Sequence, residues 1–167
     1  EIQNHRLQNL STPPASPVNG LIYFDTDLAC AMVYDAVRSK WLSEALVTLQ
    51  VGRTGAAAPG TSLRMAPDVP MSTTPFKAPR NLTLVGITIA TSAAEQFTLR
   101  IDDVIGGSST QLAILYAAAG PVATTSYIDN TLNSAFNLND SIDVYILSSL
   151  TGNISNPIVK LFFKYRK

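Results

Sequence analysis

Two segments near the end of the chain alternate in hydropathy with a period of two, which predicts β-strands. They are residues 137–149 and residues 157–165. Each segment also carries an aromatic side chain on its second face, Tyr145 in the first segment and Phe162 in the second. A strand with two apolar faces needs cover on both sides. These strands therefore predict a sheet whose outer face is buried, either by another part of the chain or by a second copy.

The composition suits a sheet protein. Charged residues form 14% of the 167 residues, well below the usual quarter. Serine, threonine and asparagine are abundant instead, and they favour strands and turns. The net charge of zero argues against a face that binds nucleic acid. The basic residues at the end of the chain are therefore expected to be solvated flanks of a terminal strand.

Few residues are available for catalysis or cofactor binding. The single histidine, His5, lies in a polar segment, and the single cysteine, Cys30, lies in an apolar one. A nucleophilic dyad or triad is therefore not expected. No phosphate-binding loop, dinucleotide-binding motif or zinc-ligand spacing occurs, and no apolar run approaches the ~20 residues that cross a bilayer. We expect a protein that is not an enzyme, holds no cofactor and does not insert into a membrane.

Three pairs of carboxylates are the remaining candidates for a polar site. They are Asp25 with Asp27, Asp102 with Asp103, and Asp140 with Asp143. Aspartate at turns and strand ends most often accepts hydrogen bonds from backbone N–H groups. We assign the pairs to such positions, with Ca²⁺ binding and sugar hydrolysis as the alternatives.

The chain divides into three parts by composition. Residues 1–19 are polar and rich in proline, which predicts an extended arm. Residues 20–45 hold short apolar runs between aspartate-containing turns, which predicts a small β-meander ending near Trp41. Residues 46–167 show strand signals between short polar turns and no helical period, which predicts an antiparallel β-sandwich or barrel. The predicted fold class is therefore all-β.

One predicted strand carries a signal for an irregularity. Residues 81–90 alternate in one phase up to Leu84 and in the other phase from Val85 onward, next to Gly86. A slip of one residue would turn the apolar side chains to the wrong face unless an extra residue is accommodated. The sequence therefore predicts a β-bulge at this point.

A series of short motifs occupies residues 6–42. In order they are Arg-Leu-Gln-Asn-Leu at 6–10, Pro-Val-Asn-Gly at 17–20, an apolar strand, Asp-Thr-Asp at 25–27, Tyr-Asp at 34–35 and Trp41. This series resembles a module of bacteriophage tail fibres and related virion appendages. The resemblance implies a structural protein on the surface of a virion, on a tail or head appendage, that contacts other virion proteins.

The closing strands carry a second resemblance. Residues 136–145 contain a leucine, a turn and a strand, with Asn139 before Asp140, and residues 159–165 end the chain as an alternating strand. This part is similar to the small trimeric jelly rolls of the tumour-necrosis-factor and C1q type, which usually have glycine where Asn139 stands. Asparagine tolerates the same left-handed conformation. The resemblance implies a jelly-roll-like sandwich that forms a homotrimer.

These resemblances give the two faces of the closing strands specific roles. The residues expected in the core are Val159, Leu161 and Phe163. The residues expected in the trimer interface are Tyr145, Leu147 and Phe162, which would lie nearly opposite one another if the two strands pair. The alternative is that the arm or the proline-rich residues 67–80 of the same chain cover this face.

The expected function is that of a homotrimeric fibre or appendage subunit of a tailed bacteriophage whose head binds a glycan or protein of the host surface. The candidate receptor loops are residues 102–109 and 118–125, because binding residues concentrate on loops. The residues named in them are Asp102, Asp103, Ser108 and Ser109. A capsid decoration protein is one alternative, and a non-viral carbohydrate-binding or carbohydrate-active domain is another.

Overall fold

A computed structural model describes residues 7–65, 69–71, 75–105, 108–117 and 124–167, with only the backbone at 69–70, 103–105, 108–117 and Thr124. The described residues form strands and turns and contain no helix, which confirms the predicted all-β class. Accordingly, these residues include no helix with the length and hydropathy needed to cross a membrane.

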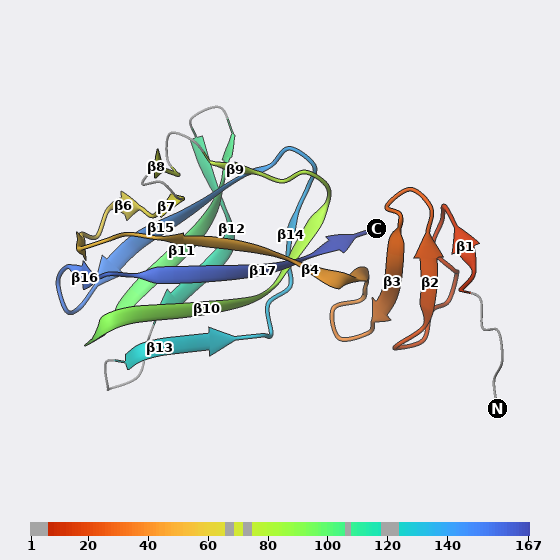
Figure 1. The fold of residues 1–167 in the computed structure, drawn as a ribbon, viewed down its shortest axis with the longest axis horizontal. Helices are drawn as coiled ribbons and strands as arrows, with labels where there is room; N and C mark the ends of the chain where they lie inside the picture. The colour runs from red at the N-terminus through yellow and green to blue at the C-terminus, as the bar shows by residue number, and fades with distance from the viewer. Residues whose placement is uncertain (1–6, 66–68, 72–74, 106–107, 118–123) are drawn as a thin grey trace.

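The first sheet extends along the whole molecule (Figure 1). Its strands, in spatial order, are β1 (Asn9–Leu10), β2 (Ile22–Asp25), β3 (Cys30–Asp35), β4 (Lys40–Gly52), β17 (Ile158–Arg166), β10 (Leu82–Glu95) and β13 (Thr124–Asp129). Three short strands attach to this path, namely β14 (Ser134–Phe136) beside β10, β7 (Arg64–Met65) beside β4, and β8 (Val69–Pro70) beside β7. All pairings in it are antiparallel except that of β1 with β2.

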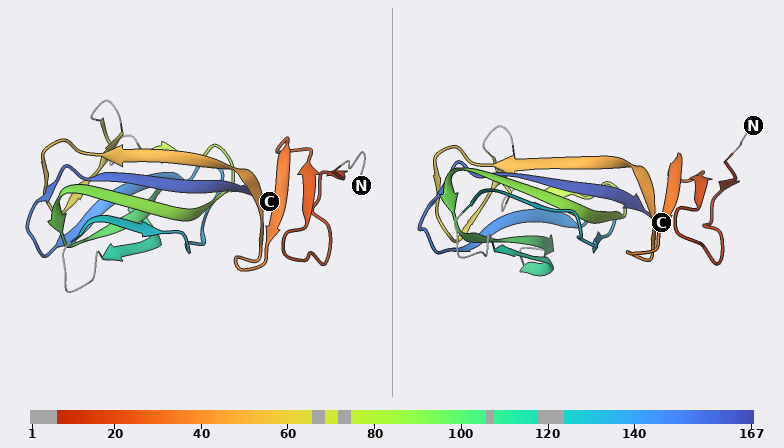
Figure 2. Two further views of the ribbon diagram at one scale, coloured as in Figure 1. Left: turned by 60° about the horizontal axis from the view of Figure 1, so that its bottom comes forward. Right: turned by 90° about the horizontal axis from the view of Figure 1, so that it is seen from below.

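The second sheet packs against one face of the first and completes a β-sandwich (Figures 1 and 2). Its strands, in spatial order, are β12 (Ser108–Ala117), β11 (Phe97–Ile105), β15 (Ser141–Ser149) and β6 (Thr61–Ser62), with β9 (Phe76–Lys77) beside β15. A separate ladder joins β5 (Ala56–Ala57) to β16 (Ile154–Ser155). The sandwich pairings are nested, because β4 pairs with β17, β6 with β15, β10 with β13 and β11 with β12.

The core lies between the two sheets and is built by alternation along their strands. Val159, Leu161 and Phe163 of β17 are fully buried, as predicted. Their partners from the second sheet include Val144 and Ile146 of β15. The ring of Phe163 meets that of Phe136 edge to face, with ring centroids 5.7 Å apart. A pair of this geometry contributes beyond the apolar area that it buries.

The predicted β-bulge is present in β10. The pairing of β10 with β17 shifts register between Leu84 and Gly86, so that Val85 is the extra residue. Leu84 and Ile87 both point into the core on either side of the shift. The bulge is what allows both apolar phases of this strand to be buried.

The turn before β15 also follows its prediction. Asn139 has a φ of +72°, in the left-handed region that asparagine tolerates better than most residues. The side chain of Asp140 accepts a hydrogen bond from the backbone N–H of Asn137 at 2.6 Å. Asp140 is therefore a turn residue, as expected.

The N-terminal part of the first sheet forms a separate small layer at one end of the sandwich. Its strands run across the direction of the sandwich strands (Figure 2). It has its own core of Tyr23, Met32 and Trp41, where the rings of Tyr23 and Trp41 meet at 90° with centroids 4.9 Å apart. The expected boundary after residue 45 falls inside β4, which is one strand shared by the small layer and the sandwich.

Candidate self-association surface

The outer side of the first sheet carries large apolar side chains. Leu46 is 54% exposed, Ile128 65% and Ile158 44%, and Phe162 is partly exposed beside them. We call these residues, together with Val85 of the bulge, the outer apolar face, and on β17 the exposed Lys160 and the partly exposed Lys164 alternate with them. Exposed apolar patches of this kind mark interaction surfaces in soluble proteins more often than isolated exposed residues do.

The register of the strands explains why Phe162 faces outward. Phe162 is opposite Thr48 of β4 and Gly86 of β10, while its neighbours Leu161 and Phe163 face the core. A Cβ atom at Gly86 would lie 2.9 Å from the Asn130 side-chain oxygen and 3.2 Å from the Asp129 carbonyl. The glycine therefore lets the segment after β13 lie close against the sheet beside Phe162.

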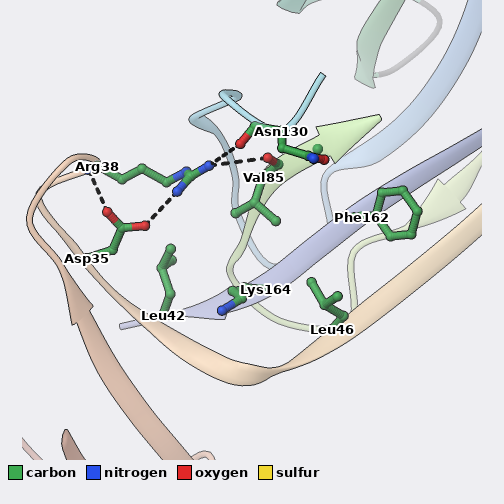
Figure 3. Close-up of a pocket in the computed structure, with 9 residues that line it drawn as sticks. Asp35, Arg38, Leu42, Leu46, Val85, Asn130, Phe162 and Lys164 are labelled. Carbon is green, nitrogen blue, oxygen red and sulfur yellow. Dashed lines mark hydrogen bonds and ion pairs between the residues drawn. The ribbon is translucent and has the colours of Figure 1, made fainter. Parts of the chain in front are cut away.

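A hollow of about 340 Å³ lies at one end of the outer apolar face, where the first sheet meets the turn between β3 and β4. Figure 3 shows Leu42, Leu46 and Phe162 around it. Arg38 and Lys164 contribute the basic groups that line it. The hollow combines an apolar wall with a polar rim, which is the usual composition of a protein interface.

Arg38 fixes the β3–β4 turn to the sandwich. Its guanidinium donates to the carbonyls of Leu132 at 2.7 Å, Asn130 at 2.6 Å and Val85 at 3.3 Å. It also forms an ion pair with Asp35 at 2.6 Å (Figure 3). A planar fork of donors is needed to reach these acceptors together, and lysine could not replace it.

Replacing Arg38 with alanine should lower the free energy of unfolding by about 2–3 kcal/mol, because partly buried acceptors lose a charged donor. Arg53→Ala is the matched control, since no hydrogen bond of the Arg53 side chain is seen among the described residues. Urea denaturation measures both variants. Equal losses in the two variants would show that Arg38 does not fix the turn.

Lys167 holds the opposite side of the small layer. Its ammonium lies 2.7 Å from a carboxylate oxygen of Asp27 and 3.2 Å from one of Asp25. Burial opposes the charge of Asp25, but hydrogen bonds from Leu28, Tyr23 and Lys167 outweigh it and hold its pKa below the ordinary value. Asp25 and Asp27 are thus structural, and the small layer is joined to the sandwich on two sides.

Tyr145 and Leu147 do not lie beside Phe162. They belong to β15, which pairs with β11, β6 and β9, whereas β17 pairs with β4 and β10. The expectation that the two closing strands pair is therefore wrong. Because the strand pairings are nested, β15 and β17 belong to different sheets. Tyr145 and Leu147 therefore face outward on the opposite side of the sandwich from Phe162.

The candidate receptor residues at 102–109 are not in a long loop. Asp102 and Asp103 belong to β11, and Ser108 and Ser109 belong to β12, so only residues 106–107 separate the strands. Asp102 is buried and unavailable to a receptor. The side chains of Asp103, Ser108 and Ser109 lie outside the described residues, as does most of the second candidate loop, 118–125.

The structure pairs acidic residues differently from the sequence-based expectation. Asp102 of β11 stands directly opposite Asp143 of β15, on the outer side of the second sheet, and both are buried. Arg100 lies next to them and covers the ring of Tyr145, with its guanidinium carbon 4.9 Å from the ring centroid. The outer side of the second sheet is thus largely polar where it is described.

Cys30 is a partly buried thiol of the small layer. Burial and the nearby charge of Asp25 raise its pKa, so it remains protonated at neutral pH. Its sulfur lies 3.6 Å from that of Met32. Over the described ranges, histidine, cysteine, aspartate and glutamate side chains form no group of three or more that would hold a metal ion, and His5 lies outside those ranges.

No model of a known protein family matches the chain, and no curated protein is significantly similar to it.

Proposed function

We propose that the protein is a structural subunit of a bacteriophage virion appendage and that it assembles as a homotrimer through the outer apolar face. The observation that carries the proposal is the contrast between the outer side of the first sheet, which is apolar, and that of the second sheet, which is largely polar where its side chains are described. The first sheet presents Leu46, Ile128, Ile158 and Phe162 outward. A partner is the cover that such a surface needs.

The nested strand pairings support the same proposal. The described pairings run first with last, second with second last, and so on inward, and this order supports the proposal of a jelly roll. The resemblance of the closing strands is to trimeric jelly rolls. A threefold axis beside the first sheet would bring three copies of Phe162 and Leu46 together and bury them. Tyr145 and Leu147, on the opposite sheet, are outside this contact.

The small layer is the part of the molecule that we propose attaches to the virion. Its strand β1 is at the edge of the first sheet, and the exposed side of the layer includes Leu21 and Ile22. Arg38 and Lys167 join the layer to the sandwich, so force on the arm would reach the head directly. We propose that this end contacts other virion proteins and that loops of the head contact the host surface.

Chemical cross-linking of purified virions that contain the chain tests the assignment to an appendage. Cross-links from Lys40 and Lys167, the amines at the small layer, to tail or appendage proteins are the expected result. Cross-links from these lysines to the major capsid subunit would instead identify a decoration protein. Absence of the chain from purified virions would refute the proposal.

A further inference from the structure

Asp102 and Asp143 form a buried carboxylate pair that the proposed assembly does not use. They are cross-strand partners on antiparallel strands, so their Cβ atoms are separated by about 5 Å. Asp102 is 1% exposed and Asp143 is 5% exposed. At that separation in a buried site, two ionised carboxylates repel each other strongly.

The cations around the pair are too few for both acids to be ionised. Arg100 donates through Nε at 2.8 Å and Nη2 at 2.7 Å to one oxygen of Asp102, Oδ2. Asp143 Oδ2 accepts from the Ser62 hydroxyl at 2.7 Å. One cation, Arg100, is therefore bonded directly to the pair of carboxylates.

Among the side chains that the structure describes, no second cation forms a hydrogen bond or ion pair with either carboxylate, although Lys77 lies nearby. Beside Asp143, β15 contributes Ser141 and the ring of Tyr145, and β9 contributes Lys77, whose ammonium donates to the Ser141 hydroxyl at 2.8 Å. Strand β12 places Gln111 opposite Asp102 in register, and its sequence contains no ionisable residue apart from Tyr116.

Each acid also has one oxygen without a hydrogen-bond partner. Asp102 Oδ1 and Asp143 Oδ1 are both buried, and neither is paired with a described group. A buried unpaired oxygen is costly, because it has given up its water without a replacement. A single hydrogen placed between the two oxygens would satisfy both, with one acid as donor and the other as acceptor.

We propose that Asp102 and Asp143 form a proton-binding site, in which protonated Asp143 donates its hydroxyl to Asp102 Oδ1. Arg100 is bonded to Asp102 and not to Asp143, so we assign the proton to Asp143. No bond other than O–H forms or breaks, and the proton exchanges with solvent. Burial first, and then the charge of Asp102, raise the pKa of Asp143, in agreement with this assignment.

The site couples the stability of the sandwich to pH. The folded protein holds a proton that the unfolded chain releases at its ordinary aspartate pKa. The stabilisation is therefore complete below that ordinary value and is lost as the pH rises through the raised pKa of folded Asp143. Over that window, release of one proton changes the unfolding equilibrium constant by at most tenfold per pH unit.

The test compares urea denaturation from pH 4 to pH 9 for wild type, Asp143→Asn and Asp140→Asn. The amide introduced by Asp143→Asn mimics the neutral acid, because its NH₂ group can donate to Asp102 and its carbonyl can accept from Ser62. We expect the pH-dependent loss of stability in wild type and in Asp140→Asn, the control at the turn, and a flattened profile in Asp143→Asn. A profile in Asp143→Asn that matches wild type would overturn the proposal.

Carboxyl ¹³C NMR of the wild-type protein gives an independent readout that needs no variant. The Asp143 carboxyl signal should titrate above the ordinary range for aspartate. Titration within or below that range would overturn the proposal. Saturable stabilisation of wild type by Ca²⁺ or Mg²⁺ that Asp143→Asn loses would also overturn it, because a cation would then occupy the place of the proton.

Discussion

Replacing Phe163 with alanine should lower the free energy of unfolding by about 3–5 kcal/mol. Phe163 is fully buried between the sheets and meets Phe136 edge to face. The truncation removes a large apolar side chain and leaves a cavity that the strands cannot close, because β17 is hydrogen-bonded on both sides. Urea denaturation at several chain concentrations measures the loss, which should be the same at each concentration.

Phe162→Ala is the matched control, since it removes the same side chain from the adjacent position on the outer face. Its cost in a free subunit should stay near the small values typical of surface positions. Because assembly stabilises the folded state by mass action, this variant should differ from wild type more as the chain concentration rises. Equal, concentration-independent losses for both variants would contradict the assignment of the two faces.

Phe162→Asp should convert the proposed trimer to monomers while leaving each subunit folded. A carboxylate buried in an apolar contact loses its water, and Lys160 and Lys164, which flank position 162 on the same side of β17, compensate for that loss only in part. Removing a central aromatic side chain from an interface commonly weakens binding about 30-fold or more. Size-exclusion chromatography with light scattering gives the mass, and circular dichroism reports whether the fold is retained.

Leu147→Asp controls for the introduction of a charge at an apolar surface position. Leu147 is 41% exposed, comparable to the residues of the outer apolar face, but lies on the opposite sheet. The Leu147→Asp variant should remain trimeric. Dissociation of Leu147→Asp with retention of the trimer in Phe162→Asp would place the interface on the second sheet instead.

The predictions that the structure confirms depend on local sequence features, chiefly the alternation of apolar and polar residues along a strand. The inward positions of Val159, Leu161 and Phe163 follow from the period of two alone. The bulge at Val85 follows from a slip in that period. The left-handed turn at Asn139 depends on one residue type at one position. Each of these features is determined by residues close together in the chain.

Pairings between distant strands could not be obtained in the same way. The two long strands near the end of the chain, β15 and β17, belong to different sheets. Each pairs with a strand from earlier in the chain, β15 with β6 and β17 with β4. The contact of Asp102 with Asp143 depends on the register of β11 against β15, which no local pattern encodes. The sequence does contain one indication that these aspartates are buried, because each lies next to buried aliphatic residues within its strand.

The role of Arg38 was also hidden in the sequence. The residue lies in a turn with no unusual pattern, and its acceptors Val85, Asn130 and Leu132 are backbone carbonyls far along the chain. Every residue type has a backbone carbonyl, so the sequence does not show which carbonyls accept these hydrogen bonds. The attachment of the small layer to the sandwich therefore became visible only in three dimensions.

Sedimentation equilibrium of the wild-type chain at micromolar concentration tests the homotrimer most directly. We expect a single species with three times the mass of one chain. A species with the mass of one chain that unfolds cooperatively would contradict it, because the outer apolar face would then be stable without a partner.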